Sequence, residues 1–146
     1  MIALACDHKG FEYIRGIKEY LDSAGYKYKD FGTYSSVSCD YPSIAVPAAR
    51  DIAGGACDKG IFICGTGIGI SIAANKIQGI RAALCTTCSM AELARSHNDA
   101  NVLALGVTVV SLDLAIEIIK VFLSTGFSGE EKHRRRIAML SELDNR

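Results

Sequence analysis

Neither sign of charge is in excess in this sequence, because 16 lysines and arginines balance 16 aspartates and glutamates. This absence argues against a protein that binds nucleic acid or a membrane surface, since both depend on an excess of positive charge. No apolar run approaches the roughly 20 residues needed to span a bilayer. The opening segment, MIALACDHKG, lacks the basic and apolar regions of a secretory signal. We therefore expect a cytoplasmic protein whose partners are small molecules or copies of itself.

Disulfides are not expected, although the chain has six cysteines. Without an export signal, these thiols should remain reduced. The only CxxC motif, Cys85 to Cys88, lacks the second cysteine or histidine pair that a structural zinc site requires. The sequence therefore predicts no metal site.

Short apolar runs alternate with helical patterns along the chain, which is typical of βαβ units and a parallel sheet. Strands are predicted at residues 1–6, 26–31, 60–64, 81–85 and 101–106, the last open to extension as far as 110. Helices are predicted at residues 11–25, 43–53, 70–76, 89–96, 112–124 and from 130 onward. No repeat or linker divides residues 1–146. We therefore expect a single α/β domain: a doubly wound, Rossmann-like, three-layer sandwich with a five-stranded parallel sheet and a C-terminal helix.

Ligands of doubly wound sheets bind beyond the carboxyl ends of the strands, near the point where the winding reverses. Four segments follow predicted strand ends: Asp7 and His8, Cys64 to Gly69, Cys85 to Thr87, and Gly106 to Thr108. These segments are the first places to look for a site.

The segment from Cys64 to Ser71, CGTGIGIS, has three glycines at alternate positions between a predicted strand and a predicted helix. Backbone N–H groups converge at such a turn and favour an anion. The alternative is a tight turn that allows close packing of helix on strand. The spacing differs from the dinucleotide fingerprint, and the Gly-Lys-Ser/Thr of a P-loop is absent.

Cys64 directly precedes this loop, where a helix N-terminus favours the thiolate form of a cysteine. Cys6 and Cys85 stand at comparable strand ends without such a loop, and we interpret them as core residues.

Two histidines and a basic run are further candidates, each with an ordinary alternative. His97 ends a predicted helix, where interaction with the helix dipole would explain it. His8 could cap the helix that follows it. Lys132 and Arg136 lie four residues apart on one helical face and could together hold a phosphate, whereas such runs usually form a solvated face.

Several motifs occur together in this chain: Asp7-His8-Lys9-Gly10, Asp40-Tyr41-Pro42, CGTGIGISIAANK at 64–76, Ser96-His97-Asn98 and the late Lys-His-Arg-Arg-Arg-Ile at 132–137. As a set, in register over essentially the whole chain, they resemble the ribose-5-phosphate isomerase B family. The resemblance implies conversion of ribose 5-phosphate to ribulose 5-phosphate through a cis-enediolate, without a metal or organic cofactor. It also implies a homodimer or a dimer of dimers with shared active sites.

The resemblance also assigns roles to residues. Cys64 matches the base that removes a carbon-bound proton, and His97 matches the acid that opens the sugar ring. Thr66 and the N–H groups of Gly65, Gly67, Ile68 and Gly69 match the groups that stabilise the enediolate. Asn98 matches a residue that binds sugar hydroxyls, while Asp7 and Tyr41 line the substrate pocket. The phosphate would be held by His8, Lys132 and Arg136.

Three positions depart from common family patterns. Some members carry a glutamate base at the position of Ile70, which cannot act, so Cys64 is left as the base. Many members have an arginine where this chain has Thr108. Lys132 replaces a phosphate-binding arginine and loses its bidentate geometry.

The same residues are also compatible with other functions. Related enzymes of the family act on allose 6-phosphate or galactose 6-phosphate. A noncatalytic phosphate- or nucleotide-binding module would use the glycine loop without needing Cys64 or His97. A thiol redox protein would use Cys85 and Cys88.

Overall fold

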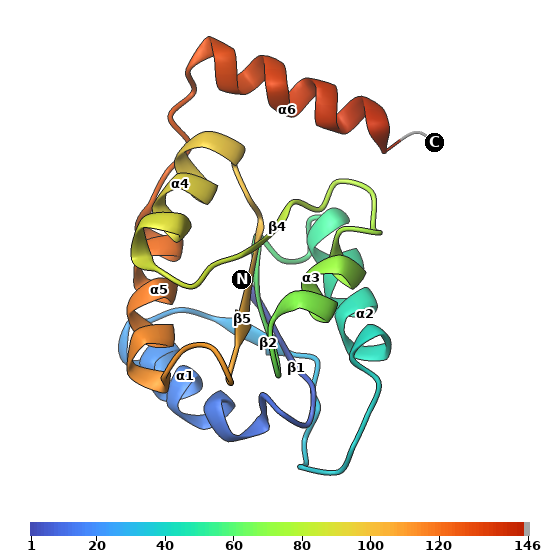
Figure 1. The fold of residues 1–146 in the computed structure, drawn as a ribbon, viewed down its shortest axis with the longest axis vertical. Helices are drawn as coiled ribbons and strands as arrows, with labels where there is room; N and C mark the ends of the chain where they lie inside the picture. The colour runs from blue at the N-terminus through green and yellow to red at the C-terminus, as the bar shows by residue number, and fades with distance from the viewer. Residues whose placement is uncertain (145–146) are drawn as a thin grey trace.

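A five-stranded parallel sheet with helices on both faces organises the chain in a computed structural model, which describes residues 1–144 (Figure 1). The strands are β1 (Ile2–Cys6), β2 (Tyr28–Asp30), β3 (Lys59–Cys64), β4 (Ala82–Leu84) and β5 (Val102–Gly106). The helices are α1 (Phe11–Ser23), α2 (Tyr41–Ala53), α3 (Ile68–Ala74), α4 (Cys88–Asn98), α5 (Leu112–Ser124) and α6 (Glu131–Leu143). The predicted fold class is confirmed.

The strand order is β2-β1-β3-β5-β4, and every pairing is parallel. Right-handed crossovers explain where the helices lie. The crossovers from β2 to β3 and from β3 to β4 lead toward the β4 side of the sheet and place α2 and α3 on one face. The crossovers from β1 to β2 and from β4 to β5 lead in the opposite direction and place α1 and α4 on the other face, where α5 also lies. As a result, α1 and α3 leave neighbouring strands toward opposite faces of the sheet.

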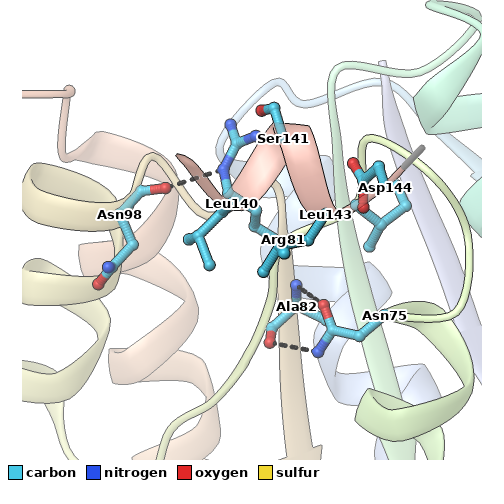
Figure 2. A pocket seen from close by; sticks show the side chains of 9 residues that line it. Asn75, Arg81, Ala82, Asn98, Leu140, Ser141, Leu143 and Asp144 are labelled. Atoms are coloured by element: carbon cyan, nitrogen blue, oxygen red, sulfur yellow. Dashed lines mark hydrogen bonds between the residues drawn. The ribbon is translucent and has the colours of Figure 1, made fainter. Parts of the chain in front are cut away.

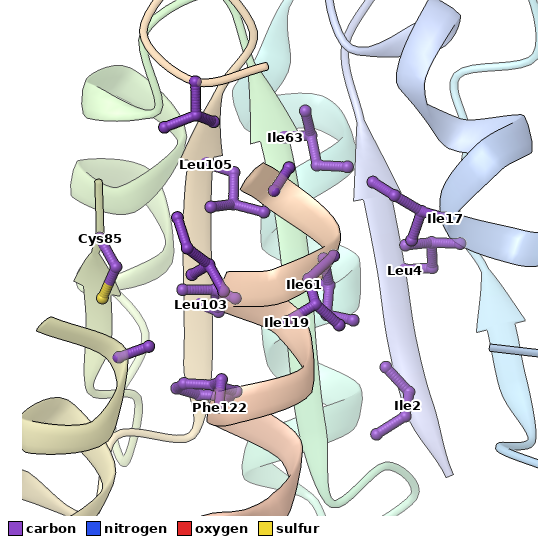
Figure 3. Packing of buried hydrophobic residues seen from close by; sticks show 14 of the residues in the cluster. Ile2, Leu4, Ile17, Ile61, Ile63, Cys85, Leu103, Leu105, Ile119 and Phe122 are labelled. Atoms are coloured by element: carbon purple, nitrogen blue, oxygen red, sulfur yellow. The ribbon is translucent and has the colours of Figure 1, made fainter. Parts of the chain in front are cut away.

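The two faces of the sheet are packed differently. The face under α1, α4 and α5 buries large aliphatic and aromatic side chains, including Ile17, Ile119 and Phe122 (Figure 3). Complete burial of each such side chain contributes roughly 1.5–3 kcal/mol. On the other face, α2 presents Ala45 and Ala48 to the sheet, which allows this helix to approach closely. Packing of helices on both faces therefore fixes the positions of the strand ends.

Element boundaries differ from the predictions for local reasons. Helix α2 begins at Tyr41, because a proline in the first helical turn, here Pro42, does not interrupt the hydrogen-bonding pattern. Strand β5 ends at Gly106 and does not extend to 110, because Val109 and Val110 donate their N–H groups back to the Gly106 carbonyl. Helix α4 continues to Asn98, so His97 lies within its last turn.

Helix α6 lies apart from the two helical layers, across the end of the molecule where β5 begins (Figure 1). Its main contact with another helix or strand is with α4. The Ser128 N–H donates to the Ser96 carbonyl at 3.0 Å and joins the segment before α6 to the end of α4. Over residues 1–144, none of the helices combines the length and hydrophobicity needed to cross a membrane.

Candidate active site

The carboxyl ends of β1 and β3 lie side by side, because Cys6 pairs in register with Ile63. Asp7 directly follows β1, and Cys64 is the last residue of β3. Because α1 and α3 then diverge to opposite faces, the winding of the sheet reverses between these two strand ends, which is where doubly wound folds bind ligands. The structure thus brings together the first group of predicted site residues.

Cys64 is only 4% exposed, and its sulfur accepts a hydrogen bond from the Gly67 N–H at 3.1 Å. This contact aims a hydrogen-bond donor of the glycine loop directly at the sulfur. Gly67 has a φ of 78°, and a Cβ there would lie 2.5 Å from Leu84 Cδ1. This position therefore requires glycine, and the glycine aims the N–H at the sulfur.

The glycine loop is held from behind by the segment after β5. The Thr108 N–H and hydroxyl both donate to the Gly65 carbonyl, at 2.9 and 2.7 Å. A Cβ at Gly106 would lie 2.3 Å from the carbonyl carbon and oxygen of Thr66, so the two backbones are in close contact. Thr108 thus fixes the peptide plane after Gly65.

Asp7 and His8 are oriented by backbone groups. Asp7 is 5% exposed, and its Oδ1 accepts the N–H groups of Lys9 and Gly10 at 2.9 and 3.2 Å. His8 Nδ1 accepts the Cys39 N–H at 3.2 Å. That contact places the proton of a neutral His8 ring on Nε2, which can then donate a hydrogen bond.

Tyr41 lies against the glycine loop. A Cβ at Gly69 would come within 2.5 Å of the Tyr41 ring, so the absence of a side chain at Gly69 makes room for the tyrosine. Thr66 is exposed, and its Oγ1 accepts the Ile68 N–H at 3.2 Å. The residues implied at the substrate therefore gather here: Asp7, His8, Tyr41, Cys64, Gly65, Thr66, Gly67, Ile68 and Gly69.

His97 and Asn98 lie elsewhere, at the amino edge of the sheet. Helix α4 returns from the end of β4 to the start of β5 and so runs antiparallel to the strands. Arg81, just before β4, donates from Nε to the Asn98 carbonyl at 2.9 Å, as Figure 2 shows. Because β5 spans five residues, the two edges of the sheet are about 13 Å apart. Within one chain, Cys64 and His97 are not brought together.

The predicted phosphate ligands also lie at opposite edges of the sheet. Lys132 and Arg136 are exposed on α6, beside the end of α4, while His8 lies at the carboxyl edge. Lys132 also forms an ion pair with Glu130 at 3.6 Å. The nearby His133 was not singled out by sequence reasoning, and its ring stacks on that of His97 with centroids 4.2 Å apart.

A cleft of about 340 Å³ lies between α6 and the start of β4 (Figure 2). Its lining includes Arg81, Asn98, Leu140 and Asp144. The Asn98 side-chain amide is turned away from Arg81. The amino edge therefore has a cleft in addition to its charged side chains.

Cys6 and Cys85, the other cysteines at strand ends, are unsuited to general acid–base catalysis. Burial is the main cause that raises the pKa of Cys6 to about 12 and that of Cys85 to about 11, so both are thiols at neutral pH. All six cysteines are free, and Cys85 is 1% exposed. Residues 1–144 contain no group of three or more His, Cys, Asp or Glu side chains arranged to hold a metal ion.

A glycine loop at the carboxyl ends of a doubly wound sheet, with a thiol that accepts a loop N–H, is typical of a small-molecule site. Residues 2–140 match the family model described as Ribose/Galactose Isomerase, and the chain belongs to that family.

Individual relatives share the fold and most of the length. Ribose-5-phosphate isomerase B of Escherichia coli is 46% identical over 99% of this chain and 97% of its own. The solved ribose-5-phosphate isomerase B of Clostridium thermocellum is 47% identical, with a TM-score of 0.96 over 99% and 97% of the two chains. The Mycoplasma genitalium ribose-5-phosphate isomerase B, solved with bound ribulose-5-phosphate, is 37% identical, with a TM-score of 0.94 over 99% and 95%. The resemblance drawn from the sequence is thereby confirmed.

Proposed function

We propose that this protein interconverts ribose 5-phosphate and ribulose 5-phosphate, with Cys64 as the base. The observation that carries the proposal is the 3.1 Å hydrogen bond from the Gly67 N–H to the Cys64 sulfur, at the adjacent carboxyl ends of β1 and β3. A base for a weakly acidic carbon-bound proton needs such stabilisation of its ionised form. Membership of the isomerase family and the named relatives support the substrate.

The proposed reaction begins when His97 donates a proton to the ring oxygen, the bond from that oxygen to C1 breaks, and the C1 hydroxyl loses its proton to solvent, which gives the open-chain aldehyde. The Cys64 thiolate then takes the proton from C2, and the electron pair forms the enediolate while negative charge gathers on the C1 oxygen. Thr66 and the loop N–H groups stabilise that oxygen as donors set in place before the reaction. Return of the proton from the Cys64 thiol to C1, with transfer of the C2 hydroxyl proton to the C1 oxygen, gives the ketose. The atoms balance without a metal or an organic cofactor.

We propose further that each active site is shared between two subunits. The two edges of the sheet support this, since one carries the base and the other carries His97, Asn98, Lys132 and Arg136. In a twofold dimer, the carboxyl edge of one subunit can meet the amino edge of its partner at two equivalent places. Exposed apolar side chains flank both edges: Ile68 and Ile72 on α3, and Met139, Leu140 and Leu143 on α6.

Coexpression of two inactive variants tests the base, the acid and the shared site together. Cys64→Ala and His97→Ala should each lose nearly all turnover of ribose 5-phosphate. In their heterodimer, one site combines both defects, while the other combines an intact Cys64 with an intact His97. Random pairing should therefore restore about a quarter of wild-type activity, because half the dimers are mixed and each has one working site. No recovery in verified heterodimers would contradict the shared site, and full activity of Cys64→Ala would contradict the mechanism.

The choice of sugar phosphate is tested separately. The family description includes galactose as well as ribose, so six-carbon phosphates are the second candidates. We expect kcat/KM for ribose 5-phosphate to exceed that for galactose 6-phosphate and allose 6-phosphate, with EDTA present throughout. A preference for a six-carbon substrate would retain the mechanism and change the substrate, whereas a strict metal requirement would contradict both.

A further inference from the structure

His133 is a buried polar residue to which the proposed mechanism gives no role. It lies in the first turns of α6, and its side chain is 5% exposed. Within residues 1–144, its Nε2 is the one buried side-chain nitrogen or oxygen without a hydrogen-bond partner. A buried polar atom without a partner is costly, so its presence needs an explanation.

The contact that covers His133 is the His97 ring. The two ring centroids are 4.2 Å apart, and the planes differ by 16°, so the rings lie nearly parallel. His97 is in the last turn of α4 and His133 is near the start of α6. The stack therefore joins the helix that carries the proposed acid to the helix that carries Lys132 and Arg136.

A neutral His133 suits this stack better than a charged one. Burial and then the nearby His97 lower the pKa of His133 below its ordinary value of 6.5. Around it on α6, Glu130 raises the pKa, while Lys132 and Arg136 lower it further. At the end of α4, Arg95 is paired at 2.8 Å with Asp99, the residue that caps this helix.

We propose that His133 is a positioning residue, whose flat neutral ring holds the ring plane of His97 in the orientation that proton transfer to the sugar oxygen requires. This inference rests on the role of His97 in the proposed function. A single hydrogen bond would fix one atom of a histidine, whereas a parallel stack fixes the plane and leaves the ring edge with its nitrogens available. The unpaired Nε2 follows from this arrangement, because His133 acts through the face of its ring.

Two apolar substitutions separate stacking from simple space filling. His133→Phe keeps a planar ring against His97, while His133→Leu fills much of the same space without a plane. Because misplacement of a reacting group by about 1 Å can cost about 100-fold in rate, we expect kcat to fall by about 10-fold or more in His133→Leu and by no more than about 3-fold in His133→Phe. KM should change by less than about twofold in both variants, since ring opening and not phosphate binding is affected.

Nuclear magnetic resonance of the imidazole protons provides a readout that does not depend on activity. The protein has only three histidines, so the His97 signals are assignable from single variants. Stacking should shift the His97 ring protons upfield in the wild type and in His133→Phe, and this shift should be lost in His133→Leu. Thermal unfolding of each variant shows whether it is folded.

The outcomes are distinct. Equal kcat values for folded His133→Leu and His133→Phe would overturn the inference, as would an unchanged His97 shift in His133→Leu. If the wild type turns over no phosphosugar, the proposed function fails, and the catalytic part of this inference fails with it. The spectra would still decide whether His133 sets the orientation of the His97 ring.

Discussion

The two edges of the sheet are built in different ways. At the carboxyl edge, each contact has a backbone group as one partner: the Gly67 N–H donates to the Cys64 sulfur, and the Thr108 hydroxyl donates to the Gly65 carbonyl. At the amino edge, a side-chain stack between His97 and His133 joins two helices, and α6 has its main contact with α4 alone. The sheet and its loops therefore fix the proposed base, Cys64. The orientation of the proposed acid, His97, depends instead on how α6 docks against α4.

The largest expected effect distinguishes Cys64 from Cys85. Both are buried cysteines at the carboxyl end of a strand that pairs with β5: Cys64 is the last residue of β3, and Cys85 directly follows β4. Cys64→Ala should lower kcat by about 1,000-fold, because a positioned general base contributes roughly 100- to 10,000-fold. Cys85→Ala, the matched control at the end of β4, should keep kcat within about twofold, since its thiol stays protonated. A steady-state assay of both variants makes the comparison. Equal losses would show that core packing, and not base chemistry, explains Cys64.

The next effect tests the contact between the glycine loop and β5. Gly106→Ala would place a Cβ 2.3 Å from the Thr66 backbone and displace the loop. We expect a loss of about 1–3 kcal/mol in the free energy of unfolding from overpacking and a fall in kcat of about 100-fold. Gly126→Ala is the control, because a Cβ there meets nothing within 4 Å. Chemical denaturation and turnover measure the two quantities, and a fully active Gly106→Ala would show that the loop tolerates displacement.

A smaller effect is expected from one hydroxyl. Thr108→Val keeps the size of the side chain and its backbone N–H but removes the hydroxyl that donates to the Gly65 carbonyl at 2.7 Å. Loss of one such hydrogen bond, about 1 kcal/mol, should reduce kcat/KM by about 5-fold. Thr108→Ser should restore most of it. If Val and Ser behave alike, the hydroxyl does not support the loop.

The smallest effect concerns the amino edge and its dependence on pH. Because the pKa of folded His133 is below 6.5, the unfolded chain binds more protons as pH falls through that value. His133 should therefore reduce stability as pH falls below about 6.5, and the loss should level off once the folded form is also protonated. Melting temperatures between about pH 7.5 and about pH 5 should fall less steeply for His133→Phe than for the wild type. Parallel curves would show that His133 does not titrate differently in the folded state.

The sequence predicted those features that depend on neighbouring residues. Alternating apolar runs and helical periodicity indicate the layers, and CGTGIGIS indicates a strand, a turn and a helix in one continuous stretch. The start of α2 was missed, and the end of β5 was left open between 106 and 110, because both depend on hydrogen bonds at a boundary. These errors did not move any strand to another place in the sheet.

The parts of the site that could not be predicted are contacts between distant segments. Thr108 reaches Gly65 across 43 positions, and Cys39 reaches His8 across 31. His133 stacks on His97 from a separate helix, with no shared motif to connect them. Residue type and spacing carry no signal for such pairs, since they arise only when the sheet and α6 are in place.

The direction of α4 has a consequence for how activity depends on concentration. A helix that joins two parallel strands must run against them, so one folded subunit holds the proposed base and acid at opposite ends. With a site shared between subunits, a lone subunit has the full set of groups and no working site. Catalysis then follows the law of mass action: specific activity falls when the enzyme is diluted below its dimer dissociation constant, and substrate that bridges both edges shifts the equilibrium back toward the dimer.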